Sequence, residues 1–237
     1  KNWNALVKVT KAGTISDTKA NAASDDYVLT YGRIYGYYNK NYDELYSGLF
    51  ITDGDDGLML YAGKITDLCF PEGESGECAF NDGDIVQVYG LVSPYNGLFE
   101  VKPQAITKVT DPAVIASVAP TSHKKLTVAN FSDNSLSIAD TGRMVEVNGL
   151  MLDGDLGSLS VGSHWTVKVK DADGNKVNIY VNYHIGADAQ NEIKSFLQGL
   201  GANEKFTFKG ALSCYNAYQL TPINSADGSA ANCFVAE

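Results

Sequence analysis

Basic side chains are scarce in this chain of 237 residues, which has 18 Lys and Arg against 28 Asp and Glu and carries a formal net charge of −10. The arginines are Arg33 and Arg143. Proteins bind polyanions largely through Lys and Arg that replace phosphate counterions, so the composition weighs against a nucleic-acid ligand. No run of about 18 apolar residues occurs, and we therefore predict no transmembrane segment.

Sequence motifs of catalysis are also missing, because the chain contains no G-x-S-x-G, H-E-x-x-H or Walker loop. His123, His164 and His184 are too scattered to define a metal site by spacing. The Asp-rich segments 53–57 and 171–175 lack the Glu that closes an EF-hand loop, and a hairpin turn explains them better than calcium does. We expect no catalytic residues, no metal and no cofactor, and hence a protein that is not an enzyme.

The cysteines form no C-x-x-C pair and stand near no histidine at zinc spacing. In an oxidising compartment, Cys69 with Cys78 would staple a loop and Cys214 with Cys233 would hold the C-terminus. Four free thiols are the alternative, and the sequence leaves both open. Small polar residues are abundant, as is typical of exported bacterial proteins. We expect an exported protein, periplasmic or at the cell surface, whose signal peptide is not part of this sequence.

Most informative is an internal repeat, a feature that signals a duplicated structural unit. Four blocks recur in the same order, and their offsets differ by only a few residues. The matched segments are 28–34 with 145–151, 52–61 with 170–180, 88–97 with 208–217, and 99–103 with 218–222. The chain is therefore a duplication with small insertions between the blocks.

Each copy is predicted to form five short strands, because apolar and polar residues alternate and turn residues separate the runs. The predicted elements follow the order of an OB-type barrel, which is a strand, two hairpins, a longer connection and a last hairpin. The longer connection has helical spacing at 188–200, whereas 67–82 is predicted to be a loop. Short segments at 14–17 and 126–130 are predicted to be helical turns that cap the barrels.

We thus predict an all-β fold of two tandem five-stranded OB-type Greek-key barrels, with a short helix in the second. The predicted domains are 1–110, a linker at 111–125, and 126–237. Three elements carry a family resemblance: Phe-Ile-Thr-Asp-Gly at 50–54, the run at 83–90, and the Tyr-Asn turn with its trailing Pro. With them, residues 14–225 resemble the OB-fold modules of secreted and surface-anchored bacterial proteins, particularly Bacteroidetes proteins and those found alongside extracellular nucleases. The resemblance implies an exported surface protein, for example a lipoprotein, and a family often labelled nucleic-acid-binding.

OB barrels bind ligands on the face of strands two and three and on the loops beside it. In copy one, the loop between strands one and two is rich in Tyr, and the loop between strands four and five contains a Ser-x-Tyr-Asn turn. Aromatic rings there would stack on bases or sugars; the alternative is that they pack the barrel end and that the repeated turn is structural. The candidate ligand-binding residues are Arg33, Tyr35, Tyr37, Tyr38, Lys40, Tyr42, Tyr95 and Asn96.

From these features we expect a non-catalytic binding module of an exported bacterial protein. Its ligand would be an oligomer, either a single-stranded nucleic acid or an oligosaccharide. The alternative is a surface scaffold that binds a protein partner and has no oligomer ligand.

Overall fold

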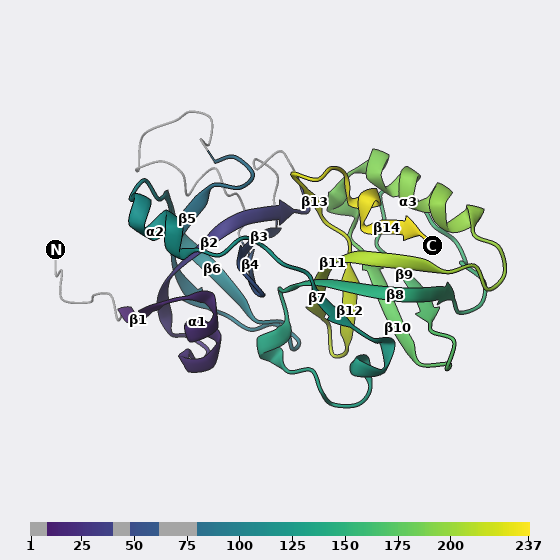
Figure 1. The fold of residues 1–237 in the computed structure, drawn as a ribbon, viewed down its shortest axis with the longest axis horizontal. Helices are drawn as coiled ribbons and strands as arrows, with labels where there is room; N and C mark the ends of the chain where they lie inside the picture. The colour runs from purple at the N-terminus through teal and green to yellow at the C-terminus, as the bar shows by residue number, and fades with distance from the viewer. Residues whose placement is uncertain (1–8, 40–47, 62–79) are drawn as a thin grey trace.

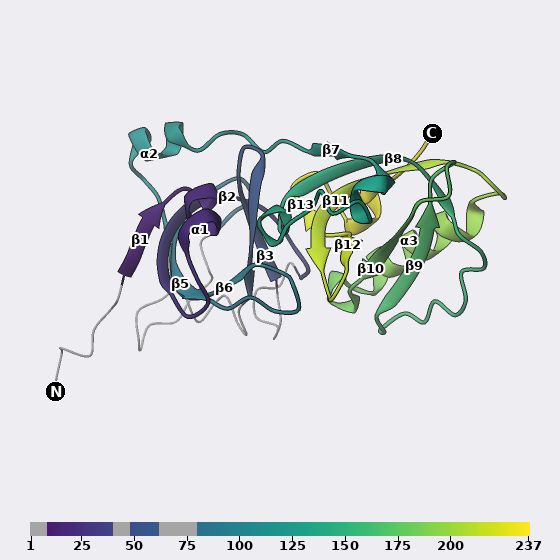
Figure 2. The same cartoon turned by 90° about the horizontal axis from the view of Figure 1, so that it is seen from below.

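The computed structural model describes residues 9–39, 48–61 and 80–237. They form two β-barrels that lie side by side along the long axis of the molecule (Figure 1). The segment that joins them contains helix α2 (Pro112–Ser117) and strand β7 (Lys124–Leu126), and it runs along one side of both barrels (Figure 2). Among the described helices, none combines the length and the hydrophobicity that a membrane-spanning helix requires.

Barrel one consists of five strands in the order β2-β3-β4-β6-β5, and a β2–β5 pairing closes it. Strands β4 and β6 pair in parallel, and the other neighbours are antiparallel. This is the strand order of an OB-type Greek key. The strands are β2 (Tyr27–Tyr37), β3 (Gly48–Asp53), β4 (Asp56–Tyr61), β5 (Ile85–Val92) and β6 (Glu100–Lys108).

Barrel two repeats the order as β8-β9-β10-β12-β11, closed by a β8–β11 pairing. Helix α3 (Ala187–Gly199) lies between β10 and β11, where a helix was predicted, and it buries Ile193 and Leu197. The prediction of two tandem OB-type barrels with a helix in the second is therefore confirmed. The strands are β8 (Met144–Leu152), β9 (Trp165–Lys170), β10 (Lys176–Val181), β11 (Phe206–Cys214) and β12 (Tyr218–Thr221).

A helical turn precedes each barrel, as the sequence predicts. Helix α1 (Ile15–Asn21) follows strand β1 (Val9–Gly13) and begins at Thr14, which forms a capping box with Asp17. The capping box satisfies backbone N–H groups that would otherwise lack partners at the helix start. Ile15 is fully buried in the core of barrel one. The 3₁₀ turn η2 (Val128–Phe131) takes the equivalent place and buries Val128 in the core of barrel two.

Both Asp-rich segments are hairpin turns. Asp53 pairs with Asp56 across the β3–β4 hairpin, while the Asp171 carboxylate accepts hydrogen bonds from the backbone N–H groups of Asp173 and Asn175. Within the described ranges, no three His, Cys, Asp or Glu side chains form a metal-binding cluster. Cys214 and Cys233 are free buried thiols and form no disulfide with each other. Cys69 and Cys78 lie outside the described residues.

Backbone and side-chain contacts join the two barrels. Gly57 of β4 packs on the backbone of Gly142, so that a side chain at Gly57 would lie 2.8 Å from the Gly142 carbonyl carbon. Beside this contact, Arg143 of copy two pairs with Asp56 of copy one at 2.7 Å. The Lys19 ammonium donates to the Thr141 carbonyl at 2.6 Å. These contacts fix which faces of the barrels meet.

The tail after β12 also returns to barrel one. Strand β13 (Asn224–Ser225) pairs with β2, placing Asn224 opposite Tyr37. The Asn224 amide donates to the carbonyls of Tyr38 and Ile185, one from each barrel. The chain then forms the 3₁₀ turn η5 (Ala230–Cys233) and strand β14 (Phe234–Ala236), which pairs with β11.

Candidate functional site

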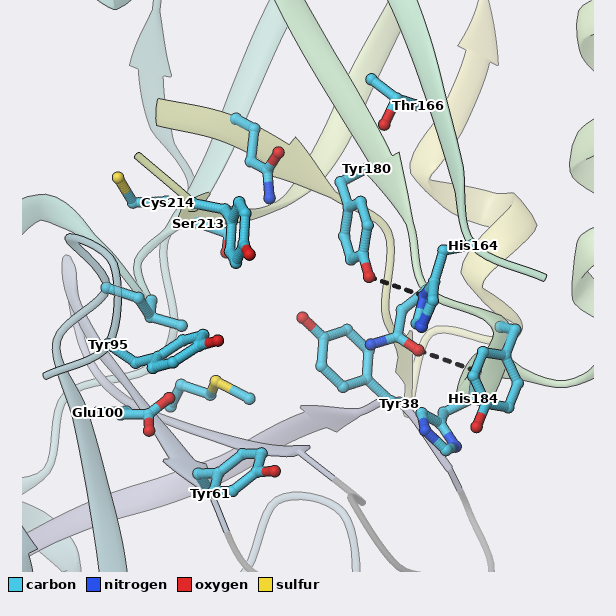
Figure 3. A pocket seen from close by; sticks show the side chains of 16 residues that line it. Tyr38, Tyr61, Tyr95, Glu100, His164, Thr166, Tyr180, His184, Ser213 and Cys214 are labelled. Atoms are coloured by element: carbon cyan, nitrogen blue, oxygen red, sulfur yellow. Dashed lines mark hydrogen bonds between the residues drawn. The ribbon is translucent and has the colours of Figure 1, made fainter. Parts of the chain in front are cut away.

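A pocket of about 640 Å³ lies between the two barrels (Figure 3). Its volume is within the range of about 300–1,000 Å³ that is usual for small-ligand sites. Tyr95, Glu100 and Tyr61 of copy one lie on one side of it, opposite Tyr180 and His164 of copy two (Figure 3). The lining residues are Tyr38, Met59, Tyr61, Tyr95, Leu98, Glu100, His164, Thr166, Tyr180, Asn182, Tyr183, His184, Ser213, Cys214, Tyr215 and Gln219.

The pocket is built from equivalent positions of the two copies. Met59 pairs with Glu100 in barrel one, and the equivalent residues Asn178 and Gln219 pair in barrel two. Three repeat-related pairs line the pocket: Tyr61 with Tyr180, Tyr95 with Tyr215, and Glu100 with Gln219. The faces that an OB barrel uses for ligands are therefore turned toward each other.

Strand alternation explains why these side chains reach the pocket. Successive side chains of a strand point to opposite faces, and Leu58 and Leu60 are fully buried in the core of barrel one. Met59 and Tyr61 consequently project from the outer face of β4. Glu100 is the β6 neighbour of Met59 and projects from the same face.

The two Ser-x-Tyr-Asn turns of the repeat contact each other. The rings of Tyr95 and Tyr215 have centroids 6.1 Å apart, and the backbone N–H of Asn216 donates to the Asn96 carbonyl at 2.8 Å. Asn96 and Asn216 have φ values of 48° and 59°, in the left-handed region that asparagine tolerates. Tyr95 and Tyr215 remain 56% and 57% exposed. The repeated turn thus joins the barrels and also presents two rings at the pocket.

Copy two contributes a cluster of aromatic side chains. The rings of His164 and Tyr180 stack with centroids 5.3 Å apart, and the Tyr180 hydroxyl hydrogen-bonds His164 Nδ1 at 2.7 Å. Next to them, the rings of Tyr183 and His184 have centroids 4.0 Å apart. Burial lowers the pKa of His164 below its usual value and so favours the neutral ring. The cluster presents ring faces and polar tips to the pocket.

Glu100 is the acidic residue of the described pocket lining. It is 5% exposed, and burial raises the pKa of its carboxyl to about 7, against the smaller opposing effect of Lys102. Among the described lining residues there is no Lys, Arg or Asp and no second Glu. The site therefore combines many rings with one buried acid.

The structure separates the candidate residues that the sequence brought together. Tyr38 and Tyr95 line the pocket, whereas Asn96 lines a neighbouring hollow behind the paired turns. Arg33 and Tyr35 line another hollow near Asp227. Neither hollow includes the repeat-related pairs that line the pocket, although the first contains the repeat-related Asn96 and Asn216.

Tyr37 lies in the core of barrel one and is 2% exposed, with its hydroxyl donating to Asp82. The register of β2 against β3 shifts between Ile34 and Gly36. Such a bulge reverses which face a side chain takes, so Tyr37 points into the barrel and Tyr38 points out. Lys40 and Tyr42 lie outside the described residues, and their role stays a prediction.

Several pocket residues were absent from the sequence-based candidates. The repeat alignment already paired Tyr61 with Tyr180 and Glu100 with Gln219, and their outward phase on the strands was the signal that would have found them. His164, Tyr183 and His184 have no such signal, because the two copies differ there.

No protein-family model matches the sequence, and no curated protein matches it. Among solved structures, the chain is similar to a putative aspartyl-tRNA synthetase from Leishmania major Friedlin, at 18% identity and a TM-score of 0.31 over 45% of this chain. The match covers 22% of the length of that protein.

Two smaller proteins are also similar. The telomere capping protein Ten1 from Saccharomyces pombe is 12% identical over 44% of this chain and 85% of its own, with a TM-score of 0.30. An OB domain from Methanosarcina mazei is 12% identical over 40% of this chain and 83% of its own, with a TM-score of 0.30. The fold assignment rests on the strand order of the two barrels.

Proposed function

We propose that this protein is a non-catalytic binding module that holds an oligosaccharide in the pocket between its barrels. The observation that carries the proposal is the composition of the pocket, in which tyrosine rings and neutral polar groups surround a space that contains no described Lys or Arg. An exported bacterial origin belongs to the same proposal and is supported by the polar composition and the resemblance described above.

The ring faces suit the apolar faces of sugars. Tyr95 and Tyr215 are more than half exposed at the pocket and bring two rings from different copies together. Behind them, the amides of Asn182 and Gln219 and the hydroxyls of Ser213 and Thr166 supply neutral donors and acceptors for sugar hydroxyls. Ligand sites usually have mostly apolar and aromatic walls, with a few polar groups that fix the orientation of the ligand.

The charge favours a glycan over a nucleic acid. Affinity for nucleic acid comes largely from Lys and Arg that replace phosphate counterions, and the described lining residues offer instead the Glu100 carboxyl. The net charge of −10 adds long-range repulsion.

The number of carboxyls favours binding over hydrolysis. Most glycosidases need two carboxyl groups on either side of the scissile bond. Glu100 is the sole acidic side chain among the described residues that line the pocket.

Alanine at Tyr95 or Tyr215 is expected to weaken glycan binding. We expect a loss of about 1–3 kcal/mol for each ring, by analogy with bases stacked on aromatic side chains. Tyr89→Ala is the matched control, because Tyr89 stacks on Tyr27 at 5.5 Å and is not among the residues that line the pocket.

The measurement is a screen of neutral oligosaccharides and of single-stranded DNA and RNA, followed by calorimetry of the hits with the three variants. Glycan binding that Tyr95→Ala and Tyr215→Ala weaken and Tyr89→Ala preserves would support the proposal. Binding of nucleic acid alone, or of no oligomer, would contradict it.

A further inference from the structure

Building on the proposed function, we infer that the pocket selects glycans that carry a free amino group, and that Glu100 and the rings beside it bind the ammonium ion. The ligand class is therefore an oligomer of amino sugars that are not N-acetylated. The inference stands on the position of Glu100, on its lack of a partner, and on the residue at the equivalent position in copy two.

Glu100 is directed into the pocket without a partner of its own. Its pairing with Met59 places it on the outer face of barrel one, and only 5% of it is exposed. In the described part of the chain, no ion pair and no side-chain hydrogen bond includes Glu100. Lys102 acts on it electrostatically but forms no ion pair with it.

A buried carboxyl without a partner is costly to keep ionised, and the fold does not require one here. Gln219 occupies the equivalent position of barrel two, opposite Asn178 as Glu100 is opposite Met59. An amide therefore fits this position of the barrel. The barrel therefore does not need a carboxyl group at this position, and the carboxyl of Glu100 in copy one faces the pocket.

The surroundings of Glu100 suit a cation. Tyr61 and Tyr95 lie on the same side of the pocket as Glu100, and Tyr38 also lines the pocket (Figure 3). Ring faces attract ammonium groups within about 6 Å of their centroids. The net charge of −10 attracts cations over longer distances. A carboxylate flanked by rings binds an ammonium ion both by charge and by the ring quadrupoles.

The test compares two hexamers of equal length, one of glucosamine and one of N-acetylglucosamine, which differ in whether the amine is free. Calorimetry at pH 7 measures both against the full chain, Glu100→Gln and Asp155→Asn. Asp155 is exposed and is not among the pocket-lining residues, so Asp155→Asn removes one negative charge without touching the site.

We expect the wild type to prefer the glucosamine hexamer by about ten-fold or more, which is the effect of a hydrogen bond to a charged group. Glu100→Gln should abolish the preference, and Asp155→Asn should keep it. Equal binding of the two hexamers, or a preference that survives in Glu100→Gln, would overturn the inference and leave the proposed function standing. Absence of binding by any glycan would overturn the proposed function itself.

Discussion

Replacing Glu100 with glutamine is expected to raise the free energy of unfolding at pH 8 by up to about 3 kcal/mol and to leave it nearly unchanged at pH 4. The carboxyl has a pKa of about 7 in the folded chain against an ordinary value of 4.5. Each pKa unit of difference between the folded and unfolded states corresponds to about 1.4 kcal/mol of folding free energy. Below pH 4.5 both states are protonated, and glutamine resembles the neutral acid in shape.

The sign follows from proton binding. Between pH 4.5 and 7 the folded state holds a proton at Glu100 that the unfolded state has lost, so the stability of the wild type falls as the pH rises through this window. Glutamine carries no such proton, and the variant should not show this decline. Lys19, His123 and His164 also have shifted pKa values, but they are common to both proteins.

Urea unfolding of the two proteins at pH values from 4 to 8 measures the difference directly. The stability curves should separate between pH 4.5 and 7 and then run parallel. Curves that stay parallel throughout would mean that Glu100 is solvated or paired in the folded chain, and would remove the ground for its role in amine recognition. A stabilised variant that has lost ligand selectivity would show that the charge is kept for binding.

Alanine at Gly57 is expected to destabilise the chain by about 1–3 kcal/mol, the usual cost of forcing an added methyl group into a packed region. The new Cβ atom would lie 2.8 Å from the Gly142 carbonyl carbon and 2.9 Å from the Arg143 Cα. Both are backbone atoms, which cannot rotate away. The contact between the barrels has to open, and the Arg143–Asp56 ion pair next to it would be strained.

Thermal unfolding checks this prediction, with a decrease of about 2–4 °C expected for each kcal/mol in a chain of this length. Gly199→Ala is the matched control, since no atom lies within 4 Å of its added Cβ and it ends helix α3. There, alanine should stabilise by up to about 1 kcal/mol. If Gly57→Ala unfolds like the wild type, the barrels do not depend on this backbone contact.

The same variant tests how the pocket depends on the arrangement of the barrels. Tyr95 and Tyr215 approach each other only because the two copies are held together. A shift at Gly57 should therefore weaken glycan binding even though Gly57 does not line the pocket.

The fold could be predicted because its signals are local and repeated. Alternating apolar residues, Asp-Gly hairpins and the helical spacing after β10 each depend on neighbours within a few positions, and the duplication shows every signal twice. The order of the strands within each barrel follows from those elements and the lengths of their connections. Even the capping turns at Ile15 and Val128 follow from short segments that recur in both copies.

The site was predicted only in part, because tertiary contacts decide it. Tyr37 and Tyr38 are adjacent and point to opposite faces, and the bulge in β2 decides that the first enters the core and the second faces the pocket. A one-residue change of register depends on pairing with β3, which a linear pattern does not encode.

What the sequence determined by itself is two copies of one barrel, each with an outward face that carries Tyr61 and Glu100 or Tyr180 and Gln219. What only the tertiary structure decided is that these faces meet and enclose a common pocket. The physical reason is distance along the chain. Contacts such as Gly57 with Gly142 and Lys19 with Thr141 join residues 85 and 122 positions apart, and their complementarity exists only after both barrels have folded.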